Sequence, residues 1–133
     1  MAPMRVLVVD DNLDSRRILV YRLRRLGIVQ IAEASNGAEA LRIIRSDLPD
    51  LIMMDLKMPV MDGWEATRAI RLEFPERHIP IMAITAQAMA GDERKALAAG
   101  CDDYLAKPIV DADVIAQKIQ RLVPGWQPEA RRQ

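Results

Sequence analysis

The chain has 133 residues, enough for one domain that buries about two thirds of the surface of its unfolded chain. Half of the residues are hydrophobic and 29% are charged, which excludes an intrinsically disordered chain. The 19 basic and 19 acidic residues cancel, so the net charge gives no support for general binding to nucleic acid or to a membrane. The single cysteine, Cys101, excludes an internal disulfide, and the first apolar run is too short for a signal peptide or a membrane span. We therefore expect a soluble, cytoplasmic protein.

Short apolar runs alternate five times with segments of helical periodicity, which is typical of an α/β protein. After a leader of residues 1–4, the first predicted strand contains Val6–Val9. Leucines recur at helical spacing over Leu13–Leu26, and Gly27 follows at the position of a C-terminal cap, so this segment is predicted to be a helix. The second strand, about Gln30–Ala34, mixes polar and apolar residues as an edge strand does.

The rest of the chain continues this alternation. The predicted strands are Leu51–Met54, Ile81–Ile84 and Tyr104–Ala106, and the predicted helices cover about Ala38–Ser46, Gly63–Glu73, a segment ending at Gly100, and Ala112–Val123. The helix that ends at Gly100 is rich in alanine and buries little per turn, so we expect it to be the least firmly packed. Residues 5–123 are expected to form the domain, and residues 124–133, with Trp126, a flexible C-terminal tail.

Acidic residues follow two of the most apolar strands. Right-handed crossovers and short loops favour a doubly wound, flavodoxin-like sheet of five parallel strands in the order 2-1-3-4-5, with the half-polar second strand at the edge. In that order Asp10 and Asp11, after the first strand, meet Asp55 after the third. Carboxylates this close cannot all stay ionised cheaply without a cation. Mg²⁺, with Mn²⁺ as an alternative, prefers such oxygen ligands and leaves coordination sites for phosphate oxygens.

Two further polar groups follow the last two strands. Thr85 supplies a hydroxyl and Lys107 an ammonium group at the same edge of the predicted sheet. A phosphoryl group would add about two negative charges to this site. New hydrogen bonds from Thr85 and from backbone N–H groups must then stabilise it, so the loop after the fourth strand is expected to move inward and to vacate space near the ring of Tyr104. A buried chemical event would thereby alter a surface of the last two helices.

Four short motifs resemble the receiver domain of two-component response regulators over about Arg5 to Val123. They are Val8-Val9-Asp10-Asp11-Asn12, Met54-Asp55-Leu56-Lys57-Met58-Pro59-Val60-Met61-Asp62-Gly63, Ile84-Thr85-Ala86 and Tyr104-Leu105-Ala106-Lys107-Pro108. Each motif is weak alone, and all four in this order are highly specific. The segments around Thr85 and Cys101 look most like receivers of hybrid histidine kinases and stand-alone phosphorelay regulators. A relay intermediate and a kinase-controlling regulator both remain open.

The resemblance implies a phosphoacceptor rather than a turnover enzyme. Asp55 would take a phosphoryl group from a phosphohistidine on a histidine kinase or a histidine phosphotransfer protein. Asp10, Asp11 and Asp55 would hold Mg²⁺ together with the backbone carbonyl of Lys57. Lys107 would contact the phosphoryl group, and in-line transfer would need mainly positioning and charge stabilisation.

The resemblance also implies how the signal is transmitted and how long it lasts. Thr85 and Tyr104 would be the switch pair that senses phosphorylation. The Lys107-Pro108 peptide bond would be cis, a geometry that is uncommon outside X-Pro bonds. Lys57 and Gln87 would flank the path of the water that attacks the phosphoaspartate, so they would tune its lifetime.

Partner contacts are expected on the first helix. Its arginines usually form a solvated face, but in receivers this helix commonly docks on the four-helix bundle that carries the donor histidine. Ser15, Arg16 and Arg22 are therefore hypothesised to contribute to docking. We expect a single-domain regulator, monomeric or weakly dimeric, because nothing after about Val123 could form a DNA-binding helix-turn-helix domain.

Two alternative functions differ at specific positions. An aspartate-nucleophile phosphatase typically carries a second acid two residues after the nucleophile, where this chain has Lys57. A nucleotide or flavin binder would need N–H groups after the first strand to bind phosphate, where Asp10 and Asp11 would repel it. Outside the motifs, His78 is expected to be an exposed loop residue, and Asp102 a residue of a solvated turn.

Overall fold

The computed structural model describes residues 3–58, 60–85, 91–107 and 111–129, and the statements below concern these ranges. Strands and helices alternate along the chain as predicted. The strands are β1 (Arg5–Val9), β2 (Gln30–Ala34), β3 (Leu51–Asp55), β4 (Ile81–Thr85) and β5 (Asp103–Ala106). The helices are α1 (Leu13–Arg25), α2 (Gly37–Ser46), α3 (Gly63–Glu73), α4 (Asp92–Ala99) and α5 (Ala112–Leu122). Within the described ranges no helix is both long enough and apolar enough to cross a membrane.

The five strands form one parallel sheet in the order β2-β1-β3-β4-β5, which confirms the predicted flavodoxin-like topology. The register sets the last residues of β1 and β3 side by side, with Val9 opposite Met54. Thr85 at the end of β4 likewise lies opposite Ala106 of β5. The segments that follow these strands therefore start from one edge of the sheet, where open α/β sheets bind their ligands.

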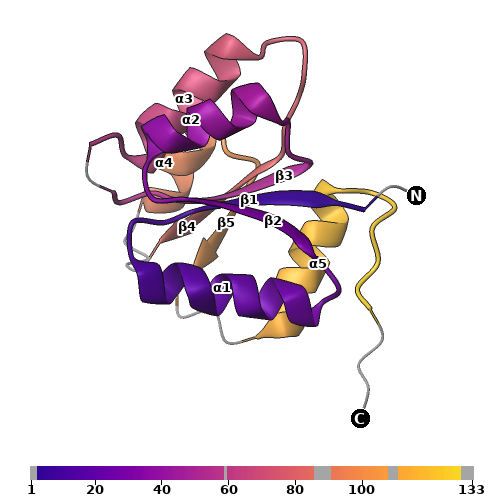
Figure 1. Cartoon of the computed structure of the whole chain (residues 1–133). Helices are drawn as coiled ribbons and strands as arrows, with labels where there is room; N and C mark the ends of the chain where they lie inside the picture. The colour runs from indigo at the N-terminus through magenta and orange to yellow at the C-terminus, as the bar shows by residue number, and fades with distance from the viewer. Residues whose placement is uncertain (1–2, 59, 86–90, 108–110, 130–133) are drawn as a thin grey trace.

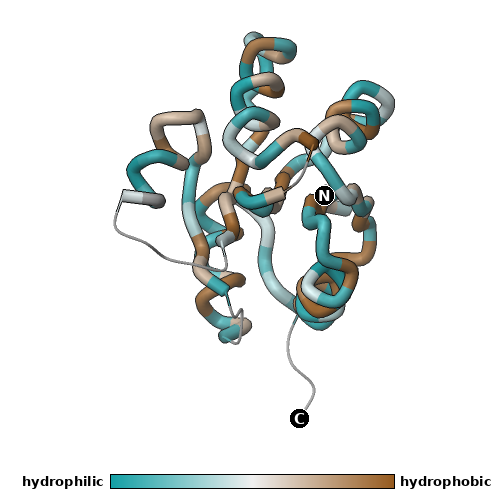
Figure 2. The backbone as a smooth tube through the Cα atoms, turned by 90° about the vertical axis from the view of Figure 1, so that its left-hand side faces the viewer, coloured by the Kyte–Doolittle hydropathy of each residue, from teal (hydrophilic) through white to brown (hydrophobic). Residues whose placement is uncertain are grey.

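Helices cover both faces of the sheet. In Figure 1, α2, α3 and α4 lie above the strands, and α1 and α5 lie below them. Successive residues of β1 alternate between two buried clusters: Leu7 and Val9 pack with the first group of helices, and Val6 and Val8 with the second. Figure 2 shows brown and teal residues alternating along the helices, as expected for helices with one buried face.

Side-chain caps fix where four of the helices begin. Asn12, Asn36, Asp62 and Asp111 each accept a hydrogen bond from a backbone N–H in the first turn of the next helix. Such a cap stabilises a helix by about 1 kcal/mol. In contrast, the N-cap residue of α4 is Gly91, which provides no side-chain cap, so the start of this helix lacks that stabilisation.

Trp126 is packed, where sequence reasoning expected a frayed end. Its side chain is 8% exposed and belongs to the cluster beneath the sheet. The Glu129 N–H donates to the Leu26 carbonyl oxygen at 2.9 Å. Gly27 adopts a φ of 93°, and a Cβ there would collide with the side chain of Glu129. Residues 124–129 therefore lie against the end of α1, while the bounds of the proposed tail stay a prediction.

Asp102 is not a solvated turn residue. Its carboxylate accepts hydrogen bonds from Arg71 Nη2 and from the Ile81 N–H, both at 2.8 Å. The exposed ring of His78 also contacts it, with Nε2 and Oδ1 at 2.6 Å. Asp102 thus joins α3 to the start of β4, and its partners lie too far away in sequence for a local pattern to indicate them.

The buried position of Trp126 predicts a large loss of stability when the ring is removed. Trp126→Ala should lower the free energy of unfolding by about 3 kcal/mol, because it removes buried apolar surface and leaves a cavity. Leu72 is 82% exposed, so Leu72→Ala is a control expected to change the stability by less than about 0.5 kcal/mol. Urea denaturation measures both. Similar values for the two variants would contradict the packing of Trp126.

Candidate functional site

Three aspartates converge at the edge of the sheet where β1 and β3 end. One carboxylate oxygen from each of Asp10, Asp11 and Asp55 lies within 4.8 Å of the other two. Asp10 and Asp55 are buried, being 4% and 6% exposed, whereas Asp11 is exposed. The sequence predicted this grouping correctly, because Asp10 and Asp11 follow the apolar strand β1 and Asp55 ends the apolar strand β3.

The backbone N–H and both carboxylate oxygens of Asp10 form hydrogen bonds within the protein. Its N–H donates to the Ala34 carbonyl oxygen of β2 at 3.0 Å. Oδ1 accepts from the Asn12 N–H at 2.9 Å, and Oδ2 accepts from Lys107 Nζ at 2.8 Å. These bonds fix the orientation of the carboxylate before any ligand binds.

Asp55 is held by the loop that follows it. Oδ1 accepts a hydrogen bond from the Lys57 N–H at 3.2 Å, and Oδ2 lies 3.6 Å from Lys107 Nζ. Gly63, the first residue of α3, packs against the backbone of Asp55, and a Cβ there would overlap the Asp55 carbonyl oxygen. The sequence predicted Gly63 as the start of a helix, which the structure confirms. Its role in close packing depends on this contact, which no local pattern predicts.

The electrostatics of the site favour a bound cation. Burial, followed by the nearby charge of Asp10, raises the pKa of Asp55 from 3.8 to about 6, although Lys107 opposes the shift. Burial acts to lower the pKa of Lys107, but its hydrogen bond to Asp10 and the charge of Asp55 raise it overall. One ammonium group cannot balance three carboxylates. Hard oxygen ligands with excess negative charge are the donor set that suits a divalent ion such as Mg²⁺.

Thr85 and Tyr104 lie on β4 and β5, the two strands that follow β3 across the sheet. Thr85 is fully buried at the end of β4, and its carbonyl oxygen accepts from the Lys107 N–H at 2.7 Å. Tyr104 on β5 is half-buried and packs on the cluster above the sheet. Gln87 and Pro108, for which roles were also expected, lie outside the described residues.

A cation–π contact joins α4 to the helix that starts beside Asp55. Lys95 Nζ of α4 lies 4.6 Å from the ring centroid of Trp64, the second residue of α3. Trp64 is half-buried, and its ring packs on the cluster above the sheet. The site end of α3 is therefore in direct contact with α4.

The residues expected to contact a phosphoryl donor lie on α1. Two of them, Ser15 and Arg16, form hydrogen bonds within the protein. The Ser15 N–H donates to Asn12 Oδ1 at 2.9 Å. Arg16 is only 15% exposed and bonds to Glu33 and to the Asp10 carbonyl oxygen. Arg22 is half-buried, and its Nε has no hydrogen-bond partner within the described ranges.

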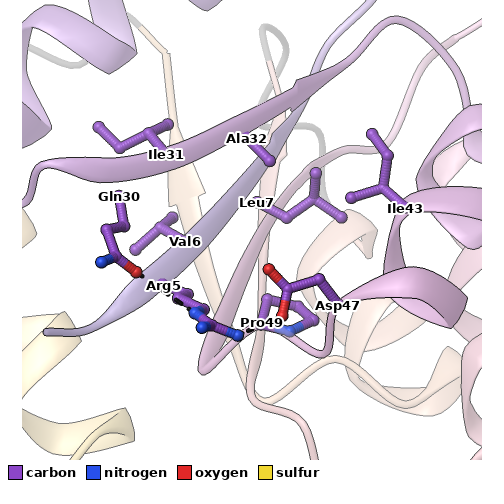
Figure 3. A pocket seen from close by; sticks show the side chains of 9 residues that line it. All are labelled: Arg5, Val6, Leu7, Gln30, Ile31, Ala32, Ile43, Asp47 and Pro49. Atoms are coloured by element: carbon purple, nitrogen blue, oxygen red, sulfur yellow. Dashed lines mark hydrogen bonds and ion pairs between the residues drawn. The ribbon is translucent and has the colours of Figure 1, made fainter. Parts of the chain in front are cut away.

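A separate pocket lies at the opposite end of the sheet, where β1 and β2 begin (Figure 3). It is lined by Arg5, Val6, Leu7, Gln30, Ile31, Ala32, Ile43, Asp47 and Pro49. Arg5 forms an ion pair with Asp47 and a hydrogen bond with Gln30 there. The volume of 210 Å³ is below the range of about 300 to 1,000 Å³ usual for ligand sites, so this pocket is not the candidate site.

Comparison with known families settles the identity of the domain. Residues 6–120 match the response regulator receiver domain. The chain belongs to this family. Receiver domains are phosphoacceptor modules of two-component signalling rather than enzymes with turnover, so the family match favours this class over a phosphatase or a nucleotide or flavin binder.

Similar proteins include long kinases and short regulators. Three hybrid or sensor histidine kinases are 44 to 46% identical to this receiver, which spans only 3 to 13% of their length. The polar-differentiation response regulator DivK of Brucella anthropi is 38% identical over 107 residues, covering 80% of this chain and 86% of DivK.

Two solved structures have the same fold. The receiver domain of sensor histidine kinase PA1611 from Pseudomonas aeruginosa, which contains a magnesium ion in its active-site cleft, has a TM-score of 0.82 at 37% identity, covering 92% of this chain and 98% of that one. A co-crystal structure from Saccharomyces cerevisiae of the histidine phosphotransfer protein Ypd1 and the receiver of Ssk1 has a TM-score of 0.78 at 37% identity, covering 90% and 88%.

The raised pKa of Asp55 predicts that a neutral isostere stabilises the metal-free receiver. Between pH 3.8 and about 6 the folded protein binds more protons at Asp55 than the unfolded chain, so the wild type loses stability as the pH rises through this window. Asp55→Asn should therefore be more stable by about 2 kcal/mol at pH 7, but not at pH 4. Urea denaturation in EDTA tests this. An advantage that is equal at both pH values would contradict it.

Proposed function

We propose that this receiver accepts a phosphoryl group on Asp55 from a phosphohistidine of a histidine kinase or a histidine phosphotransfer protein. The observation that carries the proposal is the position of Asp55, which is buried at the end of β3 with Lys107 Nζ at 3.6 Å and Asp10 alongside. The co-crystal structure of Ypd1 with the receiver of Ssk1 supports a phosphotransfer protein as the donor class. The donor would contact α1, through residues such as Ser15, Arg16 and Arg22.

The chemistry requires a nucleophile and charge stabilisation. A carboxylate oxygen of Asp55 attacks phosphorus while the P–N bond to the donor imidazole breaks, and the electron pair of that bond returns to the ring. A pKa of about 6 leaves Asp55 mostly ionised at neutral pH, so no separate base is needed. Lys107 supplies positive charge for the phosphoryl oxygens, and the Lys57 N–H holds the other carboxylate oxygen of Asp55.

We propose Asp10, Asp11, Asp55 and the backbone carbonyl of Lys57 as ligands of Mg²⁺, with Mn²⁺ as an alternative. The grouping of three carboxylate oxygens within 4.8 Å and the magnesium ion in the PA1611 receiver support this set. The ion would neutralise negative charge on the transferred phosphoryl group.

Thr85 and Tyr104 are proposed as the switch pair. Thr85 is buried next to the site, and Tyr104 lies opposite Ala83 of β4 in the sheet register. A hydrogen bond from the Thr85 hydroxyl to the phosphoryl group would shift the end of β4 and allow the ring of Tyr104 to move inward. The binding surface formed by α4, β5 and α5 would change as a result.

Residues 5–123 are proposed to form the receiver, which acts in the cytoplasm as a monomer or a weak dimer. DivK, a response regulator of which this chain covers 86%, supports a role as a response regulator. Lys57 and Gln87 tune the lifetime of the phosphoaspartate, and the Lys107-Pro108 bond is proposed to be cis.

Phosphorylation can be tested directly by intact-mass spectrometry. After incubation with acetyl phosphate and Mg²⁺, the wild type should gain the mass of one phosphoryl group, and Asp55→Ala should gain none. Asp50→Ala, which removes an exposed aspartate beside the N-terminal residue of β1, is the matched control and should react like the wild type. An adduct on Asp55→Ala, or an adduct formed equally well in EDTA, would overturn the assignment.

The switch proposal predicts that acceptance and transmission can be separated. Thr85→Ala should still be phosphorylated on Asp55, but phosphorylation should shift the amide resonances of α4 and β5 much less than in the wild type, because the hydroxyl donor is missing. Thr85→Ser keeps the hydroxyl and serves as the control. Equal shifts in all three proteins, measured by heteronuclear NMR at equal degrees of phosphorylation, would exclude Thr85 as the sensor.

A further inference from the structure

The side chain of Arg16 turns back from α1 towards the acidic cluster. Its Nη1 donates to the Asp10 carbonyl oxygen at 2.7 Å, and its Nε donates to Glu33 Oε1 of β2 at 2.9 Å. The Arg16 side chain is 15% exposed and that of Glu33 40%. One guanidinium group therefore links the edge strand to the loop between β1 and α1.

Arg16 completes the set of bonds around Asp10. The N–H and both carboxylate oxygens of Asp10 bond to Ala34, Asn12 and Lys107, and Arg16 takes the remaining polar atom, the carbonyl oxygen. Because a peptide unit is planar, a fixed Asp10 carbonyl also fixes the plane that leads to Asp11.

Asp11 depends on this peptide plane more than its neighbours do. Its exposed carboxylate has no hydrogen-bond or ion-pair partner among the described residues, yet it lies within 4.8 Å of the other two. Asp10 is held by Lys107, and Asp55 by Lys57 and Lys107. Among the described residues, the backbone of the loop directs Asp11 towards the other two carboxylates. Arg16 holds this backbone at the Asp10 carbonyl, and the Asp10 carboxylate holds it at the Asn12 N–H.

We propose that Arg16, held by Glu33, is a positioning residue that preorganises Asp11 for cation binding. This inference rests on the proposed Mg²⁺ site. Arg16 acts through the Asp10-Asp11 peptide unit and does not touch the metal or the phosphoryl group. A guanidinium group suits this role because its planar fork can donate to the carbonyl and to the carboxylate at the same time. Nε and Nη1 of Arg16 are engaged within the protein, and this positioning role is distinct from the docking contact proposed for α1.

The first test measures the affinity for Mg²⁺ without any phosphorylation. Isothermal titration calorimetry should give a dissociation constant about 10-fold weaker for Arg16→Ala than for the wild type, as is typical when an outer contact of a metal site is lost. Arg16→Lys, with one donor head, should lie between the two. Arg17→Ala removes an exposed arginine from the neighbouring position and should bind within about twofold of the wild type.

A second variant keeps the test valid if Arg16→Ala folds poorly. Glu33→Ala removes the outer anchor from a half-exposed position of the edge strand and leaves the bond between Arg16 and the Asp10 carbonyl possible. It should weaken Mg²⁺ binding in the same direction and by a smaller factor. Unchanged affinity in both Arg16→Ala and Glu33→Ala would overturn the proposal.

Amide hydrogen exchange in EDTA provides a metal-free readout of the same loop. The Ser15 N–H is capped by Asn12 Oδ1 at 2.9 Å, and the Glu39 N–H by Asn36 Oδ1 at 2.8 Å in an equivalent cap on α2. Arg16→Ala should speed exchange at Asn12 and Ser15 but not at Glu39. Uniformly faster exchange throughout the protein would indicate a general loss of stability and would contradict a local positioning role.

The outcomes separate this inference from the function on which it rests. If the wild type binds no Mg²⁺, the proposed function fails and the inference fails with it. If the wild type binds Mg²⁺ and Arg16→Ala binds it equally well, only the positioning role is wrong. Slower phosphotransfer from a histidine donor with unchanged Mg²⁺ affinity would assign Arg16 to docking instead.

Discussion

The parallel pairing of β1 with β3 brings two buried carboxylates together, and the arrangement of the site follows from this constraint. Asp10 and Asp55 extend from the ends of neighbouring strands into the same small volume, with Lys107 between them. Their mutual repulsion and burial disfavour the charged state of Asp55. Hydrogen bonds from Asn12, Lys57 and Lys107 hold the two carboxylates in this arrangement, and the close contact of Gly63 fixes the backbone of Asp55. A cation bound between the carboxylates would reduce their repulsion, so this repulsion favours cation binding.

Much of the site could be predicted from the sequence because its residues lie at the ends of strands or directly after them. The carboxyl ends of parallel strands lie at the same edge of a sheet. The sequence alone therefore placed Asp10, Asp55, Thr85 and Lys107 at one edge. The strand order followed from a similar contrast: β2 carries polar residues along its length, whereas β3 is buried throughout. These predictions used local patterns and a general rule of topology, and the strand order also drew on the resemblance to receiver domains.

The features that were missed depend on partners distant in sequence. Asp102 bonds to Arg71, which is 31 residues away, and Arg16 bonds to Glu33, which is 17 residues away. Helical periodicity indicates which face of α1 is polar, but an arginine that reaches back to a carbonyl follows the same pattern as one in solvent. Trp126 was expected to be frayed for the same reason, since its position after the last helix says nothing about the surface available beside Gly27.

The two tryptophans lie at opposite ends of the sheet and in different surroundings. Trp64 follows the acidic edge and contacts Lys95 of α4, whereas Trp126 is enclosed beside Met4 and Ile28, where β1 and β2 begin. Trp64 is therefore placed where a change between the acidic edge and α4 alters the surroundings of its ring. Trp126 is placed where its surroundings depend on the packing of the core beneath the sheet. The two indole rings thus sample different parts of the fold, so that variants keeping one tryptophan each would distinguish a local change at the site from a change in the core.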